Sequence, residues 1–158
     1  MDDGLFQEII EEVDSMSPEQ FQSLHEQIKA PSREEYKRNL YAIIERALTT
    51  SIVVRREGLL ALESSLDSDK VANRDIFEYG LRFVIDGTDY AFIDKILSNL
   101  IKQEKDEYQI TLKTIQKEAV LAIQSGDNPR MIVYLLNSYT DIPLSDPVFT
   151  KIIEEEGY

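Results

Sequence analysis

The stretch that decides the fold begins with VRREGLLALE at residues 54–63 and continues with IFEYGLRFVIDGTD at residues 76–89. The first run predicts the end of a helix. The second predicts a compact helix over 74–86 that is apolar on most of its surface and therefore largely buried. At its end, Asp86-Gly87-Thr88 indicates a stop and a new start, because Gly87 suits the left-handed position after a helix and Thr88 suits the next N-cap.

Two long helices are expected on either side of this short helix. The first runs from a capping box at Ser32 to about Glu63, and the second from Thr88 to about Ser125. The first carries an inward stripe whose second half is rich in small residues: Ala47, Ser51, Val54, Gly58 and Leu62. Glycine inside a helix costs about 1 kcal/mol relative to alanine, so we expect a partner helix to approach Gly58 closely. The two long helices should then lie antiparallel, joined through the short buried helix.

Shorter helices are expected at both ends. Residues 1–31 predict two N-terminal capping helices, over about 4–14 and from a second capping box at Ser17 to Ala30. Residues 126–158 predict a turn at Gly126 and helices after Pro129 and Pro147. No segment alternates as a strand would, so the chain reads as one all-α domain over 1–158 with a helical core over 32–125.

The composition of the chain narrows the classes of partner and the location that we expect for it. The chain has no cysteine, and 30 acidic against 17 basic residues give a net charge of −13. That charge opposes nucleic acid and anionic membranes and favours a basic partner surface. No apolar run reaches the ~20 residues of a membrane span, and no secretory signal is evident. These patterns predict a soluble, cytoplasmic protein.

A search for chemistry finds no candidate catalytic, cofactor or metal residues. His25, the only histidine, falls on a polar helix face and is expected to be an ordinary surface side chain. Gly80 and Gly87 bracket a helix and form no phosphate-binding loop. The acidic runs at both ends lack the pocket that separates the pKa values of a working acid–base pair. An enzyme is therefore not expected.

The candidate binding residues are charges. Arg55, Arg56 and Arg82 either form ion pairs that fix helix packing or present a basic spot to an acidic partner. Lys70 and Arg74 lie in or beside the polar break of 64–73, where a loop is accessible to a partner. Aromatic residues near the C-terminus either form an exposed patch or close the core: Tyr134, Tyr139 and Phe149.

The pattern RREGLLALE, then F..GLRFVIDGTD, then a helical run from Ile93 to Glu104 resembles the cytoplasmic part of the flagellar stator A subunit (MotA, of the MotA/TolQ/ExbB proton-channel superfamily). The resemblance covers about a third of the chain. It implies a domain that meets the charged face of the rotor switch protein (FliG). The family's membrane helices have no counterpart, so ion conduction is not expected. The rotor-facing region corresponds to the neighbourhood of Asp67, Asp69, Lys70, Arg74 and Asp75.

We therefore expect a non-enzymatic interaction module associated with the flagellar motor, located in the cytoplasm at the inner face of the motor. Its protein partner would be the stator, the rotor switch or a neighbouring structural protein. The alternative is a helical scaffold or assembly protein unrelated to motility, and homo-oligomerisation is left open. A small-molecule sensor is a third class. A position of Gly58 in open water, or a solvent-exposed 74–86, would remove the structural support for the motor interpretation.

Overall fold

The computed structural model describes residues 17–20 and 32–155. The chain divides into two compact units, residues 1–35 and 36–158, which are described separately. In the first unit, Ser17 and Gln20 exchange side-chain to main-chain hydrogen bonds of 3.0 and 3.1 Å, and Glu35 N donates to Ser32 Oγ at 3.2 Å. The capping box at Ser17 is confirmed in both directions, and at Ser32 the bond to the serine hydroxyl is confirmed. The expected helix over 4–14, the rest of the second helix and His25 lie outside the described residues.

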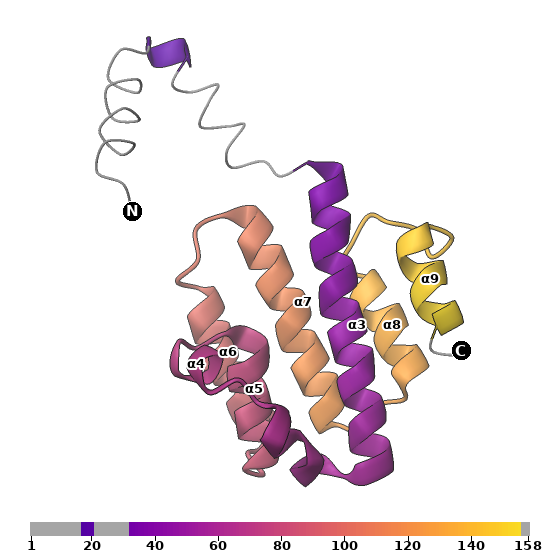
Figure 1. Ribbon diagram of the computed structural model, residues 1–158. Helices are drawn as coiled ribbons and strands as arrows, with labels where there is room; N and C mark the ends of the chain where they lie inside the picture. Colours follow the sequence, from indigo (N-terminus) through magenta and orange to yellow (C-terminus); the bar gives the residue numbers. More distant parts are fainter. Residues whose placement is uncertain (1–16, 21–31, 156–158) are drawn as a thin grey trace, which may run out of the picture. The chain divides into compact units, whose positions relative to one another are not determined.

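All regular structure in the described ranges is helical, which confirms the all-α class (Figure 1). The helices are α3 (Arg33–Glu57), the 3-10 helix η1 (Leu59–Ser65), α4 (Ser68–Ala72), α5 (Ile76–Ile85), α6 (Tyr90–Ile101), α7 (Glu107–Gln124), α8 (Pro129–Asn137) and α9 (Pro147–Glu155). Within these ranges, no helix combines the length and apolar character that crossing a membrane requires.

The first long helix ends earlier than expected, and the role assigned to Gly58 is wrong. α3 stops at Glu57, and Gly58 follows with φ +89°. Gly58 is exposed, and a Cβ built on it would have no neighbour within 4 Å. The residue therefore ends the helix through a backbone conformation that other residues rarely adopt. It does not admit a partner helix.

The short helix α5 is buried as predicted. Asp75 caps it by accepting from Glu78 N at 3.0 Å, and its buried residues are Ile76, Phe77, Glu78, Gly80, Leu81 and Val84. The close helix contact expected at Gly58 is made here instead. A Cβ on Gly80 would lie 2.8 Å from both Val120 γ carbons.

The turn after α5 matches its prediction except at the new N-cap. Gly87 has φ +77°, and Thr88 N donates to Phe83 O at 3.0 Å, which completes a Schellman-type end. Asp86 is the C-cap of α5. The N-cap of the next helix is Asp89, which accepts from Ala91 N at 3.2 Å, so the assignment of Thr88 to this role is wrong.

The expected helix from Thr88 to Ser125 is two helices, α6 and α7, separated at residues 102–106. Glu104 Oε1 accepts from Lys105 N and Asp106 N at 3.1 and 3.3 Å, and Asp106 caps α7 by accepting from Tyr108 N at 3.1 Å. These bonds to main-chain N–H groups provide an alternative to the helical ladder and stabilise the reversal. The prediction of one continuous helix is wrong because it followed the apolar spacing through this point.

The reversal decides which helices pair in which direction. Ion pairs from Lys117 to Asp94 and from Lys113 to Glu104 connect α6 and α7 in antiparallel order. The rings of Tyr36 and Tyr108, near the N-termini of α3 and α7, lie 5.7 Å apart. α3 therefore runs parallel to α7 (Figure 1), and the antiparallel pairing belongs to α6 and α7.

The C-terminal helices complete the core of the second unit. Gly126 has φ +72° and Asn128 caps α8, so the predicted turn is confirmed. Phe149 on α9 is fully buried, whereas Tyr134 and Tyr139 are 44% and 40% exposed. Phe149 thus closes the core, and only the two tyrosines reach the surface.

Candidate protein-interaction site

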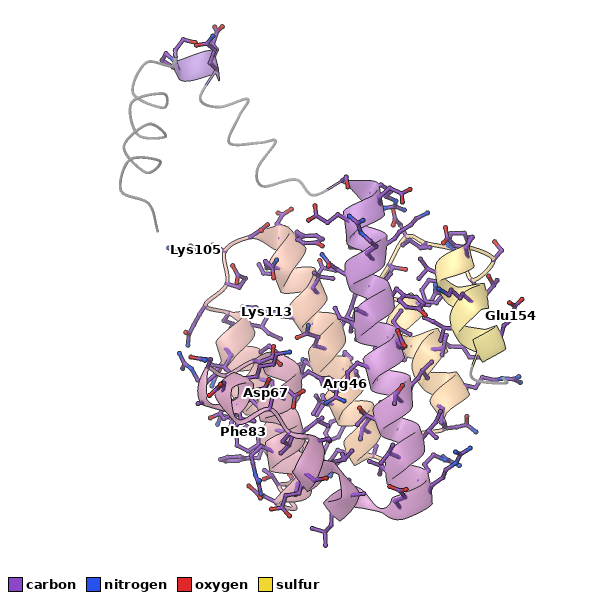
Figure 2. All side chains as sticks on the ribbon, in the orientation of Figure 1. Arg46, Asp67, Phe83, Lys105, Lys113 and Glu154 are labelled. Atoms are coloured by element: carbon purple, nitrogen blue, oxygen red, sulfur yellow. The ribbon has the colours of Figure 1, made fainter. Side chains whose placement is uncertain are left out.

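Five of the predicted partner-binding residues gather around one hollow beside α4. Its volume is about 470 Å³. Its lining from the polar break and the start of α5 is Asp67, Asp69, Lys70, Asn73, Arg74, Asp75 and Ile76, and its lining from α7 is Gln109, Leu112, Lys113 and Gln116. We call this hollow and the two that adjoin it the α4 groove. Figure 2 labels three of the residues that surround it: Arg46 on α3, Asp67 before α4 and Lys113 on α7.

Two of the groove's aspartates act as helix N-caps. Asp67 Oδ1 accepts from Asp69 N and Lys70 N at 3.0 and 3.2 Å and so caps α4. Asp75 caps α5 in the same way. Each of these carboxylates therefore uses one oxygen, Oδ1, to cap a helix and keeps its negative charge at the groove.

A partly buried ion pair holds α4 in place. Glu78 on α5, whose side chain is 8% exposed, accepts from Arg46 Nη2 on α3 at 2.9 Å. Its second oxygen accepts from Asp67 N at 3.3 Å. The guanidinium of Arg46 also lies over the Phe77 ring, 5.6 Å from its centroid. A single carboxylate thus connects α3 and α5 to the first residue of the groove, which makes Glu78 a positioning residue.

Two cations of the groove are unpaired. Lys70 and Arg74 are exposed, and their side chains form no hydrogen bond or ion pair with any described residue. Arg74 has φ +59°, a left-handed conformation that is uncommon outside glycine and often occurs at functional sites. Its backbone is held by a hydrogen bond from Arg74 N to Val71 O at 3.1 Å.

Lys113 is paired. Its Nζ lies 2.9 Å from Glu104 Oε2. Three hydrogen bonds lower the pKa of Glu104: the one from Lys113 has the largest effect, and those from Asp106 N and Lys105 N have smaller effects. Lys113 therefore stabilises the α6–α7 reversal, and its charge is largely neutralised within the groove.

The three predicted arginines lie outside the groove. One of them forms the ion pairs expected of a packing role, and the other two are exposed without such pairs. Arg82 pairs with Asp86 one turn away and approaches Glu63 at 3.9 Å, and its hydrogen bond to Asp86 lowers the pKa of that carboxyl. Arg55 and Arg56 are exposed in the last turn of α3, without an ion pair among the described residues. There they interact favourably with the negative end of the helix dipole.

Sequence reasoning missed the α7 side of the groove. Gln109, Lys113 and Gln116 recur at steps of four and three, which places them on one helix face. This polar stripe was visible in the sequence. Its proximity to α4 was not, because that depends on the reversal at 102–106.

A second cluster of titratable groups lies on α6, α7 and the end of α8. Lys117 Nζ donates to Asp94 Oδ1 at 2.9 Å and to Ser98 Oγ at 3.2 Å. Burial would lower the pKa of Lys117, but the hydrogen bond to Asp94 and the charges of Asp94 and Glu118 outweigh it and raise that pKa. The hydrogen bond from Lys117 lowers the pKa of Asp94. Each of these polar groups has a partner, so the cluster joins helices and offers no vacant site.

No metal site is found in the part of the chain that the structure describes, where no three His, Cys, Asp or Glu residues are grouped to hold an ion. Comparison of the chain with protein-family models, with curated proteins and with solved structures found no match of any of the three kinds.

Proposed function

We propose that this chain is a non-enzymatic helical interaction module that docks a protein partner in the α4 groove. The observation that carries the proposal is the gathering of Asp67, Asp69, Lys70, Arg74 and Asp75 around one hollow in which Lys70 and Arg74 have no partner among the described residues. A rigid scaffold supports them, because Glu78 ties the start of α4 to α3 and α5. Docking needs no large rearrangement of such a surface.

The stator resemblance identifies the partner to test first. It predicts docking to a stator, rotor-switch or neighbouring structural component at the inner, cytoplasmic face of the flagellar motor. Only the order of the three sequence motifs supports this partner. Gly58 faces solvent, and this is the outcome stated above to remove the structural support for the motor interpretation, although α5 is buried as expected.

Site-specific photo-crosslinking in motile cells tests the proposal. A crosslinking amino acid at Asn73, which is exposed and lines the groove, should capture a motor component that mass spectrometry identifies. The matched control is Glu154 on α9, which is also exposed (Figure 2). Capture at Asn73 and not at Glu154 supports docking in the groove, whereas equal capture at both positions contradicts it.

Deletion of the gene separates the motor partner from other partners. Loss of motility with normal growth is the expected result. Normal motility, together with crosslinks from Asn73 to a protein outside the motor, would instead establish the alternative, a helical scaffold unrelated to motility.

A further inference from the structure

We propose that residues 67–74, which contain α4 and which we call the α4 flap, open and close as one unit while α5, α7 and α8 stay folded, and that a partner binds the closed form. Opening of the flap is a property of the chain alone, whereas binding to its closed form rests on the proposed function.

The α4 flap has little buried surface to hold it closed. No residue of α4 is buried, and only Val71 is partly covered. α5 is the described helix that packs against α4, and the side of α4 toward α7 borders the hollow of about 470 Å³. A helix of five residues is not stable by itself in water, where even about 12–15 residues are marginal. The helical form of α4 therefore depends on the bonds at its two ends.

The residues on either side of the flap are anchored in the core. Leu66 packs against the core cluster, and Ile76 is buried within it. Opening can therefore stop at these two positions, because going further would expose apolar side chains to water. The flap has a defined start and a defined end.

At its first end the flap is held by Glu78. One oxygen of this carboxylate accepts from Asp67 N at 3.3 Å, and the other accepts from Arg46 Nη2 at 2.9 Å. Glu78 lies on the buried helix α5 and keeps its bond to Arg46 whether or not Asp67 N is bound. It can thus act as a latch that releases the flap without disturbing the core.

The second end of the flap is strained where comparable helix ends are not. Asp75 N donates to Lys70 O at 2.9 Å, and Arg74 has φ +59°, so α4 ends in a Schellman motif. α5 and α7 end in the same way, but there Gly87 and Gly126 occupy the left-handed position. A residue with a Cβ pays a free-energy cost in this conformation that glycine does not. Closure of the flap is therefore weakened at Arg74.

The closed flap supplies one wall of the α4 groove. Its residues that line the central hollow are Asp67, Asp69, Lys70, Asn73 and Arg74, and α7 lines the other side. Opening removes this wall, so a partner that contacts both walls binds the closed form and shifts the population toward it. Because the flap is closed in the structure, docking still needs no large rearrangement.

Amide hydrogen exchange of the full chain without a partner, followed by NMR at increasing urea below the unfolding transition, tests the opening. The amides of Val71, Asn73 and Asp75 donate hydrogen bonds within the segment. They should exchange at least about a hundredfold faster than buried amides of α7 and α8, at a rate that urea does not change, because local opening exposes little surface. Equal protection and equal urea dependence in α4 and α7 would overturn the inference.

Two substitutions at position 74 form a matched pair. Arg74→Gly removes the strain and should slow exchange in α4 about three- to fivefold, since the relief outweighs the added freedom of glycine in the open form. Arg74→Ala removes the same charge but keeps the strain, so exchange should stay within about 1.5-fold of the unaltered chain. Equal exchange in the two variants, or a change in α8 as large as that in α4, would overturn the inference.

Glu78→Gln tests the latch. This variant keeps the shape of the side chain but replaces a charged acceptor by a neutral one, and exchange in α4 should become about tenfold faster. Unchanged exchange in α4 would reject Glu78 as the latch.

The two proposals fail separately. Partner capture at Asn73 without local opening of α4 would reject the flap and leave docking intact. Local opening of α4 without any crosslinked protein would retain the flap and reject the proposed partner interaction. Where a partner is captured, its addition should slow exchange in α4 and leave α8 unchanged, and unaltered exchange in α4 would reject binding to the closed form.

Discussion

Replacement of Gly80 by alanine should destabilise the protein, although alanine favours helices. Gly80 lies within α5 and is buried where this helix crosses α7. An added methyl group would stand 2.8 Å from both γ carbons of Val120 and 3.1 Å from Cδ1 of Leu97. Contacts below 3.0 Å force a shift, and here two of the three atoms belong to one stiff side chain.

Two opposing effects set the magnitude. Glycine to alanine gains up to about 1 kcal/mol of helix propensity. Overpacking a well-filled core costs about 1–3 kcal/mol. Val120 is β-branched and strongly prefers one χ1 rotamer in a helix, and rotation would bring one methyl group back toward the new one. Relief therefore requires α5 and α7 to separate, and we expect a net loss of about 1–2 kcal/mol in the free energy of unfolding.

Urea denaturation followed by circular dichroism, with a double-mutant cycle, measures this effect. Val120→Ala alone removes two buried methyl groups and should cost roughly 1.6 kcal/mol or more. The variant with both Gly80→Ala and Val120→Ala should be more stable than the sum of the two losses by about 1 kcal/mol, because the new methyl group occupies vacated space. Strict additivity, or a stabilising Gly80→Ala, would refute the close approach of the two helices.

Gly58→Ala is the matched control. Its φ of +89° is unfavourable for alanine, but no atom lies within 4 Å of the added Cβ. It should lose about 1 kcal/mol or somewhat more through the backbone alone. It should show no coupling to Val120→Ala, which distinguishes a conformational requirement for glycine from a steric one.

Three further predictions follow from buried polar groups and the α6–α7 reversal. Thr50 Oγ1 is buried without a hydrogen-bond partner among the described residues, so Thr50→Val should raise the free energy of unfolding by about 1 kcal/mol in urea titration; a loss would show that the hydroxyl is bonded. Glu78→Ala should lower the free energy of unfolding by about 1–3 kcal/mol, because Asp67 N loses its acceptor. Amide hydrogen exchange should speed up more in α4 than in α8. An equal increase in both helices would contradict the positioning role. Lys113 lowers the pKa of Glu104, so the ionised carboxylate stabilises the folded protein above its ordinary pKa of 4.5, and this stability is lost as the pH falls through the lower folded value. Glu104→Gln should therefore make the free energy of unfolding less dependent on pH on the acid side. An unchanged pH dependence would show that the pair contributes nothing.

Local signals in the sequence were sufficient for several of the caps and helix ends. Gly87 and Gly126 both adopt the left-handed conformation that their positions after apolar helices predicted. Asp75 and Asn128 cap helices through short-range bonds to residues two or three positions on. Such features depend on a few neighbouring residues, so they can be recognised without knowledge of the tertiary structure.

The two glycines show where local reasoning fails. Gly58 and Gly80 both lie within apolar helical patterns, and the sequence alone does not separate a glycine that ends a helix from one that another helix covers. Arg55 and Arg56 precede Gly58 with charges that belong at a helix C-terminus, which was the available signal for an end. For Gly80 the deciding fact is the position of Val120, forty residues later, and no local pattern contains it.

The reversal at residues 102–106 has the largest consequence for the candidate site. A continuous helix from Thr88 to Ser125 would be about 57 Å long and would carry Gln116 away from α4. The apolar spacing favoured this helix because the step from Leu100 to Tyr108 keeps the same face on both sides of the break. The contrary signal was Asp106 followed three residues later by Gln109, a capping-box pattern that we overlooked.

The groove is therefore a product of chain reversal rather than of any one motif. Its α4 side could be located from charge and polarity, because loop residues between apolar helices are accessible. Its α7 side could not, because Gln109 and Gln116 look like ordinary solvated positions on a helix until Glu104 and Asp106 turn the chain back. If the α4 groove binds a partner, recognition depends on this turn even where its residues touch no ligand. Sequences with the same polar break but no acceptors at 104 and 106 should lack the second wall of the groove.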